Sequence, residues 1–162
     1  MRSKAAAVGF VLAIALPVWI LDQITKFVVI ANLGVHDAIT VIPGFFDLVH
    51  VHNTGAAFGM MRNNNTFFIG LSAVATIVLL VLTARRAFPD AMTRTAAGLL
   101  LGGVWGNLTD RLIHGHVVDF LHFYHKAWAW PAFNLADSCI CVAAGLFILK
   151  SFFEDPPPRP AP

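Results

Sequence analysis

Four long apolar segments limit what this chain can fold into more than any other feature of its sequence. An α-helix rises about 1.5 Å per residue, so about 20 apolar residues are needed to cross about 30 Å of hydrocarbon. The segments, each near or above that length, span about residues 7–31, 65–84, 92–113 and 131–153. Only 12% of the residues are charged, roughly half of the share in a soluble domain. We therefore predict an all-α membrane protein with four transmembrane helices in a single domain, residues 1–155.

The two ends of the chain are interpreted separately. The N-terminal sequence MRSKAAAVGFVLAIALPVW has the basic residues and apolar run of a secretory signal. Its apolar character continues past Trp19 without a small-residue cleavage site, so we interpret it as a retained first helix. The proline-rich residues 156–162 are predicted to be disordered. Cys139 and Cys141 lie two positions apart and do not face each other on a helix, so we interpret them as small apolar residues, not a disulfide or metal pair.

The long segment 32–64, between the first and second helices, favours short strands. It contains the sequence AITVIPGFFDLVHVHN, in which β-branched residues alternate with others and Pro43-Gly44 indicates a turn. We expect a small β-sheet there.

Lysine and arginine residues predict the orientation in the membrane. Most of them lie in three short regions: before the first apolar segment, between the second and third, and at the end of the fourth. These residues are Arg2, Lys4, Arg85, Arg86, Arg94, Lys150 and Arg159. Segments 32–64 and 114–130 are longer and hold only Arg62 and Lys126, and Arg111 lies just before the second of them. The positive-inside rule places both termini in the cytoplasm and these two segments outside. The formal net charge of +2 is too small to suggest a nucleic-acid partner.

Polar residues inside three of the four apolar segments fall at one level, near the outer surface. Ionisable residues in transmembrane segments usually face the bundle interior and serve function. Their spacing of three, four or seven positions puts those of each helix on one face. The polar residues at this level are Asp22, Thr25, Lys26, Asn107, Asp110, Arg111, His114, Asn134 and Asp137. The Asp22–Lys26 pair is equally compatible with two interfacial groups that satisfy each other.

Two aspartates are the best candidates for chemistry. Asp119 lies just past the outer end of the third segment, and Asp137 lies just inside the outer end of the fourth. Two carboxyl groups held close together share one proton. The ionised group can then take a proton from water, and the protonated group can polarise a peptide carbonyl. A serine–lysine dyad has no good candidate, because Ser72 has no nearby base and Ser138 points away from Asp137.

Two other functions remain open on the residues alone. A zinc-dependent membrane protease would use the outward cluster of His114, His116, Asp119, His122 and His125, although no HExxH motif is present. A small proton-coupled transporter would use the carboxylates to carry protons. Against it, the chain has no evident internal repeat, and its polar level lies near one surface.

At these residues the chain resembles the lipoprotein signal peptidases, the aspartyl signal peptidases (signal peptidase II) of bacteria. Five motifs occur in order over about residues 20–140. They are DQITK at 22–26, NTGAAFG at 53–59, GGVWGNLTDR at 102–111, GHVVDF at 115–120 and FNLADS at 133–138. Each alone is weak, but the five together are specific.

The resemblance implies roles for individual residues. It makes Asp119 and Asp137 the catalytic pair, with no metal and no cofactor. Polar residues that position the substrate are matched by Asn53, Asn107, Arg111 and Asn134. Supporting positions are matched by Asp22, Lys26, Asp110 and Gly55.

The resemblance also implies the fold and the reaction. The fold would have four transmembrane helices, a small extracytoplasmic β-sheet and a periplasmic helix or flap. The enzyme would act in the bacterial cytoplasmic (inner) membrane with its site near the outer face. It would cleave prolipoproteins just before their diacylglyceryl-modified cysteine. The expected partners are lipid-modified signal peptides and membrane lipids, and the expected oligomeric state is a monomer.

Overall fold

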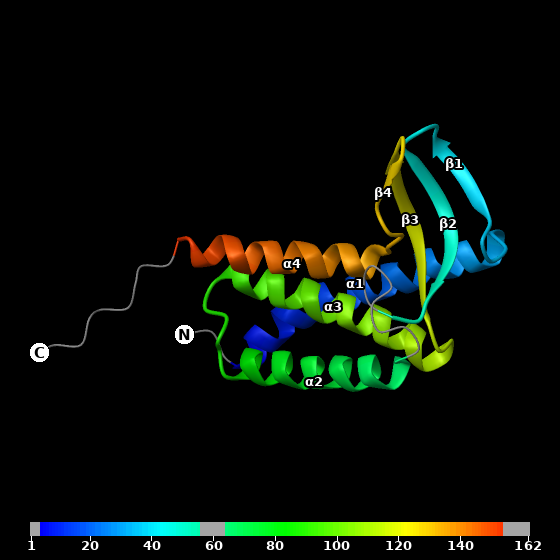
Figure 1. Cartoon of the computed structure of the whole chain (residues 1–162). Coiled ribbons are helices and arrows are strands. Elements are labelled where there is room, and N and C mark those ends of the chain that lie inside the picture. The colour runs from blue at the N-terminus through cyan, green and yellow to red at the C-terminus, as the bar shows by residue number, and fades with distance from the viewer. Residues whose placement is uncertain (1–3, 56–63, 154–162) are drawn as a thin grey trace, which may run out of the picture.

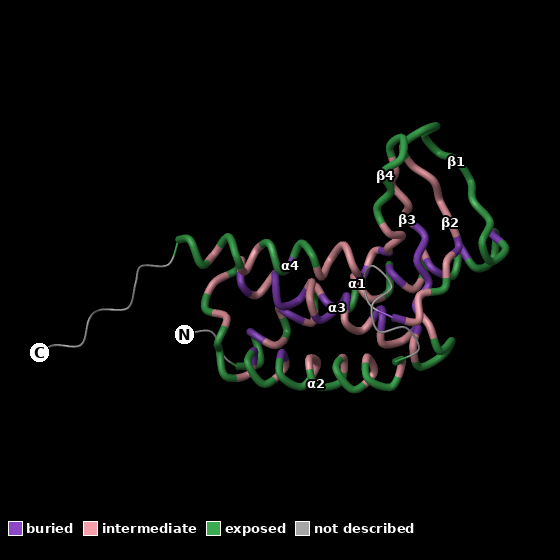
Figure 2. The backbone as a smooth tube through the Cα atoms, viewed as in Figure 1, coloured by how far each residue is buried: buried purple, intermediate pink, exposed green. Residues whose placement is uncertain are grey.

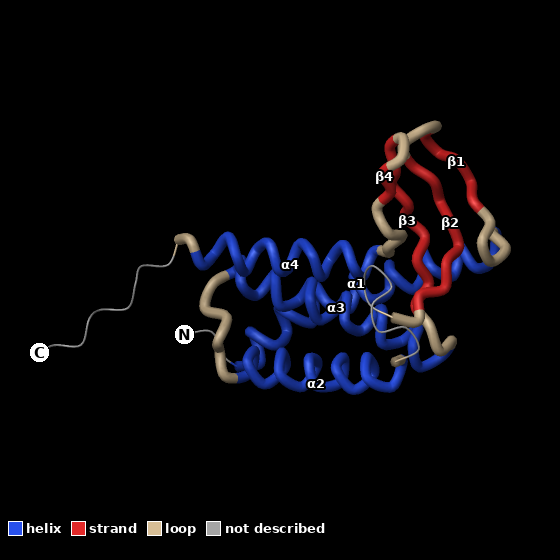
Figure 3. The backbone as a smooth tube through the Cα atoms, viewed as in Figure 1, coloured by secondary structure: helices blue, strands red, loops and turns tan. Residues whose placement is uncertain are grey.

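The computed structural model describes residues 4–55 and 64–153, and within them a four-helix bundle carries a small sheet at one end (Figures 1 and 3). The elements follow in the order α1 (Lys4–Asn32), β1 (Ala38–Ile42), β2 (Phe46–Asn53), α2 (Asn65–Ala84), α3 (Ala91–Ile113), β3 (Val117–His125), β4 (Trp128–Ala129) and α4 (Leu135–Ser151). The four helices lie in the four predicted apolar segments. The proline-rich tail, 156–162, lies outside the described residues.

The outer surface of the bundle is apolar. α2 buries only Leu79 and Thr83 among its residues, whereas Val74 and Ile77 are 58% and 63% exposed. Figure 2 shows this exposure along the whole length of α2. A surface of large apolar side chains at this density indicates an apolar solvent, because soluble proteins rarely expose such patches. The chain is therefore a membrane protein.

Two of the four described helices are long and apolar enough to cross a membrane. α1 and α2 have mean hydropathies of 2.1 and 2.5 in their most apolar stretches. α3 is more polar, and α4 has 17 residues. The structure thus confirms a helical bundle with a small sheet, while the predicted number of four transmembrane helices stays a prediction.

α4 begins at Leu135, four residues after the start of the predicted segment. Residues before it are extended because the backbone of Phe133 pairs with that of Leu121 on β3. The Phe133 nitrogen donates to the Leu121 oxygen at 3.0 Å, and the Leu121 nitrogen donates back at 2.8 Å. This pairing replaces the first turn of the predicted helix and brings the start of α4 against β3.

α3 lies in the middle of the bundle and packs closely on its neighbours through glycine. A Cβ at Gly102 would lie 2.7 Å from the Ala15 oxygen of α1, and one at Gly103 would lie 2.6 Å from the Ala136 oxygen. A Cβ at Gly106 would collide with the Asp22 carboxylate. Small residues let transmembrane helices approach closely, and here they bring both α1 and α4 close to the polar end of α3.

The sheet is antiparallel with strand order β1-β2-β3-β4, and it extends across the direction of the helices (Figure 1). The predicted turn at Pro43-Gly44 is confirmed: Gly44 has φ of +76° in the connection between β1 and β2. The strands β3 and β4 lie in segment 114–130, for which the sequence predicted no strand. The predicted periplasmic helix or flap has no helical counterpart among the described residues outside α1–α4 and stays a prediction.

Candidate active site

Asp119 and Asp137 come from different elements and meet around a single amide side chain. Asp119 lies on β3, and Asp137 lies in the first turn of α4. The Asn134 Nδ2 donates to Asp119 Oδ1 at 2.8 Å, while the Asn134 Oδ1 accepts from the Asp137 backbone nitrogen at 2.9 Å. Asn134 is fully buried. The two carboxyl groups, 18 positions apart in sequence, therefore belong to one polar cluster.

The local sequence explains why Asp137 points toward β3. Asn134 is the N-cap of α4, and Asp137 occupies the third helical position in a capping box. The Asp137 carboxylate accepts from the Asn134 backbone nitrogen at 3.3 Å, so it bends back over the helix start. Reciprocal hydrogen bonds of this kind satisfy backbone N–H groups that a helix terminus leaves without partners. The same contacts hold the carboxylate at the end of the helix that faces the sheet.

Two more asparagine side chains complete the contacts of the carboxyl groups. Asn53 at the end of β2 donates to Asp119 Oδ2 at 2.9 Å. Asn107 on α3 donates to Asp137 Oδ1 at 2.7 Å. The sheet register places Val51 opposite Asp119, so Asn53 reaches Asp119 diagonally from the neighbouring strand. Four elements thus contribute side chains to the site.

Asp119 is only 2% exposed. Burial raises the pKa of Asp119 from its ordinary 3.8 to about 7, and the nearby charge of Asp137 adds to this effect. The hydrogen bonds from Asn53 and Asn134 lower the pKa and oppose it in part. Because an acid is protonated below its pKa, Asp119 holds a proton through most of the range below neutrality. The site therefore contains an acid that can donate near physiological pH.

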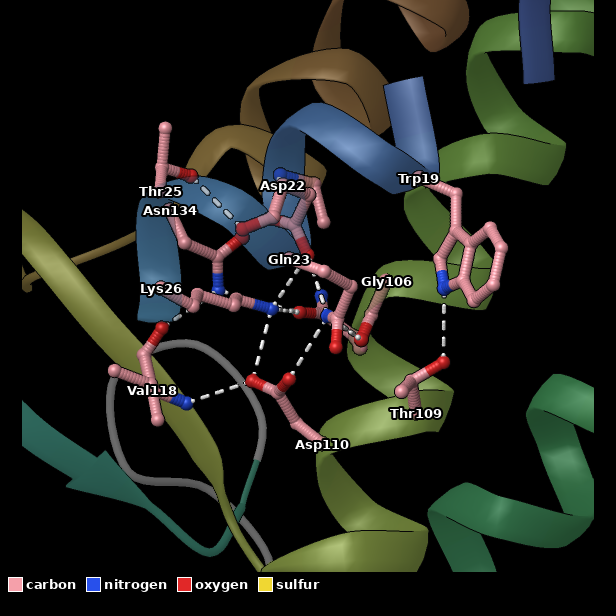
Figure 4. A network of polar contacts seen from close by, with 12 residues as sticks. Trp19, Asp22, Gln23, Thr25, Lys26, Gly106, Thr109, Asp110, Val118 and Asn134 are labelled. Atoms are coloured by element: carbon pink, nitrogen blue, oxygen red, sulfur yellow. Dashed lines mark hydrogen bonds and ion pairs between the residues drawn. The ribbon is translucent and has the colours of Figure 1, made fainter. Parts of the chain in front are cut away.

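A buried ion cluster of Asp22, Lys26 and Asp110 lies next to Val118 and Asn134 (Figure 4). The Lys26 Nζ lies 2.8 Å from Asp22 Oδ2 and 2.9 Å from Asp110 Oδ2, and all three residues are at most 2% exposed. The sequence left open whether Asp22 and Lys26 are interfacial groups. Their burial and their shared partner on α3 place them in the bundle interior, as ionisable residues in membranes usually are.

Arg111 lies on α3 with its guanidinium against the loop after β2. Its Nη2 donates to the Gly55 oxygen at 3.2 Å, its Nη1 donates to the Asn107 oxygen at 3.3 Å, and its Cζ lies 4.9 Å from the centre of the Phe68 ring. The buried Nε has no hydrogen-bond partner among the described residues. Arg111 therefore joins α3 to the loop after β2 beside the polar cluster, and each of its Nη atoms has a second N–H that a substrate carbonyl could use. Gly55 is the last described residue before position 64.

The histidines of the outward cluster divide into separate groups. His116 stacks on His52 of β2 with ring centres 3.6 Å apart, and His114 lies 6.0 Å from His116. His122 stacks on Tyr124 instead. Within the described ranges, no three histidine, cysteine or acidic side chains are arranged to hold a metal ion. The structure thus does not bring together the residues that the zinc-protease alternative requires.

One residue of the cluster was missed by sequence reasoning. The Gln23 Nε2 donates to Asp110 Oδ1 at 3.1 Å and to the Gly106 oxygen at 3.3 Å. Gln23 directly follows Asp22, and adjacent positions on a helix point in different directions, so helical spacing excluded it. Its place inside the DQITK motif was the only available signal.

Comparison with known protein families gives a match over most of the chain. The family described as signal peptidase (SPase) II matches residues 14–153. A lipoprotein signal peptidase from Symbiobacterium thermophilum is 43% identical over 85% of this chain and 91% of its own length. One from Syntrophotalea carbinolica is 45% identical over 92% and 94%, and one from Neisseria meningitidis is 44% identical over 85% and 86%.

Solved structures agree with this match. A bacterial membrane enzyme determined by the in meso method at 2.3 Å resolution superposes with a TM-score of 0.83 at 30% identity, over 94% of this chain and 95% of that one. A second, at 1.9 Å resolution, gives a TM-score of 0.80 at 31% identity over 91% and 95%. The likeness therefore covers the bundle and the sheet together.

Proposed function

The chain belongs to the signal peptidase II family, and from this premise we propose that Asp119 and Asp137 form its catalytic pair. It is a membrane peptidase that removes signal peptides from prolipoproteins. The observation that carries the assignment of the pair is the shared contact with Asn134, at 2.8 Å to Asp119 and 2.9 Å to the backbone of Asp137. Two carboxyl groups held in one buried cluster can divide the acid and base roles of peptide hydrolysis.

The proposed mechanism uses one proton held between the two groups. With Asp119 protonated, the Asp137 carboxylate takes a proton from water as the water oxygen attacks the scissile carbonyl carbon. The Asp119 hydroxyl donates to the carbonyl oxygen and stabilises its developing negative charge. Collapse of the tetrahedral intermediate breaks the carbon–nitrogen bond, and the leaving nitrogen takes a proton from the pair. The products are a signal peptide with a new carboxylate and a lipoprotein whose N-terminus is the lipid-modified cysteine.

The roles of the other predicted site residues follow from their contacts. The three asparagines hold the carboxyl groups of the pair by hydrogen bonds; they are Asn53, Asn107 and Asn134. Arg111 binds backbone groups of the substrate. The oxygen of Gly55 accepts a hydrogen bond from Arg111, and Gly55 is proposed to shape the loop beside the site. Supporting roles are proposed for Asp22, Lys26 and Asp110. No metal or cofactor takes part in this mechanism.

We further propose that all four helices cross the membrane in a single domain, residues 1–155. Both termini would lie in the cytoplasm and the sheet outside, at the end of the bundle that carries Asp119. The buried polar cluster lies at that same end (Figures 1 and 4). Cleavage would then occur near the outer face of the bacterial cytoplasmic membrane, on diacylglyceryl-modified substrates, by a monomer surrounded by lipid.

Metal chelation tests the aspartate mechanism against the zinc alternative. The purified protein should cleave a lipidated prolipoprotein at an unchanged rate after dialysis against a strong chelator, because a carboxyl pair needs no Lewis acid. The measurement is the mobility shift of the substrate on a gel. Loss of activity that returns when zinc is added would overturn the mechanism. An unlipidated substrate of the same sequence serves as the control for dependence on the lipid.

Arg111→Lys is expected to reduce turnover at least about tenfold, which corresponds to about 1.4 kcal/mol of barrier. Lysine keeps the charge but cannot contact two carbonyl oxygens and present a third donor in one plane. The measurement is the initial rate at equal amounts of folded protein, with Arg94→Lys at the other end of α3 as the matched control. Turnover within twofold of the parent would return Arg111 to a role at the lipid interface.

A further inference from the structure

We propose that Lys26 is a positioning residue that fixes the placement of Asp119 and Asp137 relative to each other. This inference rests on the proposed catalytic pair and goes beyond the supporting role that the family resemblance implies. In this proposal, the buried ammonium group of Lys26 connects α4, which carries Asp137, to β3, which carries Asp119.

The ammonium of Lys26 has an acceptor for each of its three protons. Besides Asp22 and Asp110 at 2.8 and 2.9 Å, its Nζ donates to Asn107 Oδ1 at 3.1 Å. An ammonium group has three donors and no acceptor, so these contacts use its full capacity. With 2% exposure, Lys26 is also shielded from water. Its position in the cluster is therefore determined by three partners on two helices.

Each carboxylate that contacts Lys26 also holds the backbone next to one aspartate of the pair. The Asp22 Oδ1 accepts from the Ala136 nitrogen at 2.9 Å, one residue before Asp137. The Asp110 Oδ2 accepts from the Val118 nitrogen at 3.0 Å, one residue before Asp119 (Figure 4). Lys26 bridges these two carboxylates. Lys26 thus connects the start of α4 to β3 through two carboxylates, in addition to the direct backbone pairing of Phe133 with Leu121.

The third contact of Lys26 orients a side chain that touches Asp137. Because the ammonium only donates, Asn107 must turn its oxygen toward Lys26, and its Nδ2 then points at Asp137 Oδ1 at 2.7 Å. Without this donor, a flipped Asn107 would direct its oxygen at the carboxylate and repel it. Asn134 also donates to Asn107 Oδ1, at 3.2 Å, which supports the same orientation from the other side.

The charge of Lys26 also reaches the pair. The charged groups that act on Asp119 or face it are Asp137 on α4, Lys26 on α1 and Arg111 on α3. The positive charge of Lys26 lowers the pKa of Asp119, in opposition to the larger effect of burial. Removal of this charge should raise that pKa further. The rate of cleavage should then fall at a higher pH, because the proton on Asp119 is lost later as the pH rises.

The competing explanation is that Lys26 only balances two buried carboxylates. Removing one partner from a buried ion cluster is destabilising, whereas a fully neutral replacement is often tolerated. A triple variant with Asp22→Asn, Lys26→Met and Asp110→Asn separates the two explanations. It has no buried charge to balance, and its amide oxygens can still accept from the backbone at Ala136 and Val118.

The experiment measures kcat, KM and the pH profile of cleavage for the parent, for Lys26→Met and for the triple variant, each at its measured folded fraction. We expect Lys26→Met to lose at least about thirtyfold in kcat with KM changed less than about threefold, and its alkaline limb to move to higher pH. The triple variant should melt closer to the parent and keep the loss of kcat. Lys150→Met, at a lysine 3.3 Å from Asp90 and 27% exposed, is the matched control and should leave kcat and the pH profile unchanged.

Return of the parent's kcat and pH profile in the triple variant would show that Lys26 only balances charge and would overturn the proposal. If Lys26→Met does not fold, the triple variant alone decides in the same way. Asn107→Leu should reduce kcat by a smaller factor in the triple variant than in the parent, because Lys26 acts through that side chain. An equal reduction of kcat in both backgrounds counts against the proposal. Asp119→Asn, measured in parallel, distinguishes failure of the catalytic pair from failure of the positioning role. If Asp119→Asn is active, the proposed catalytic pair is wrong. If it is inactive while the Lys26 variants behave like the parent, only the positioning role of Lys26 is wrong.

Discussion

Asp119→Asn and Asp137→Asn are each expected to lower the rate of prolipoprotein cleavage at least about a thousandfold, within the range that general acid–base catalysis contributes. Asparagine keeps the shape of aspartate and can still accept one hydrogen bond from Asn53 or Asn107. It cannot take a proton from water or give one to the leaving nitrogen. The measurement is single-turnover cleavage in a gel-shift assay with purified protein and a lipidated substrate.

The control for these variants is Asp47→Asn on β2. Asp47 accepts from the Tyr124 hydroxyl at 3.2 Å and makes no contact with the pair, so its change should leave the rate within twofold. The double variant of Asp119 and Asp137 should be no slower than the single ones, because residues that act as a unit are not additive. Substantial turnover by either single variant would remove that residue from the mechanism.

Asn134→Asp is expected to lower the rate at least about a hundredfold, while the protein stays folded. The carboxylate of aspartate can still cap α4 by accepting from the Asp137 backbone nitrogen, since aspartate and asparagine are comparable N-caps. It cannot donate to Asp119 Oδ1, and it places a third carboxyl group beside two that already share one proton. The rate and the melting temperature are measured together.

Asn32→Asp provides the matched control for this change. Asn32 is exposed at the end of α1, and its side chain donates to the Val28 oxygen of the same helix at 2.7 Å. It should leave the rate unchanged. A fall in the melting temperature of Asn134→Asp that accounts for the whole loss of activity would indicate a cap without a catalytic contribution. A rate close to that of the parent would mean that the bridge between the two aspartates is not needed.

The sequence alone was sufficient for the presence of the four helices and for the residues of the polar cluster other than Gln23. Apolar length predicted four helices because the backbone of a long apolar segment satisfies its own hydrogen bonds only as a helix in lipid. The spacing of Asn107, Asp110 and Arg111 predicted one polar face of α3, because helical periodicity is a local property. The five motifs pointed to the family, and the comparisons confirmed it.

Only the tertiary structure decided how these residues are arranged. Strand β3 depends on its pairing with β2, and the late start of α4 depends on the pairing of Phe133 with Leu121. These are contacts between segments, and they leave no periodic pattern in any one of them. The same holds for the contact of Asn53 with Asp119 and for the burial of Lys26 between Asp22 and Asp110. A sequence can give the type and the face of a polar residue. Its partner is decided where two segments pack, because burial makes an unpaired polar group too costly to leave unsatisfied.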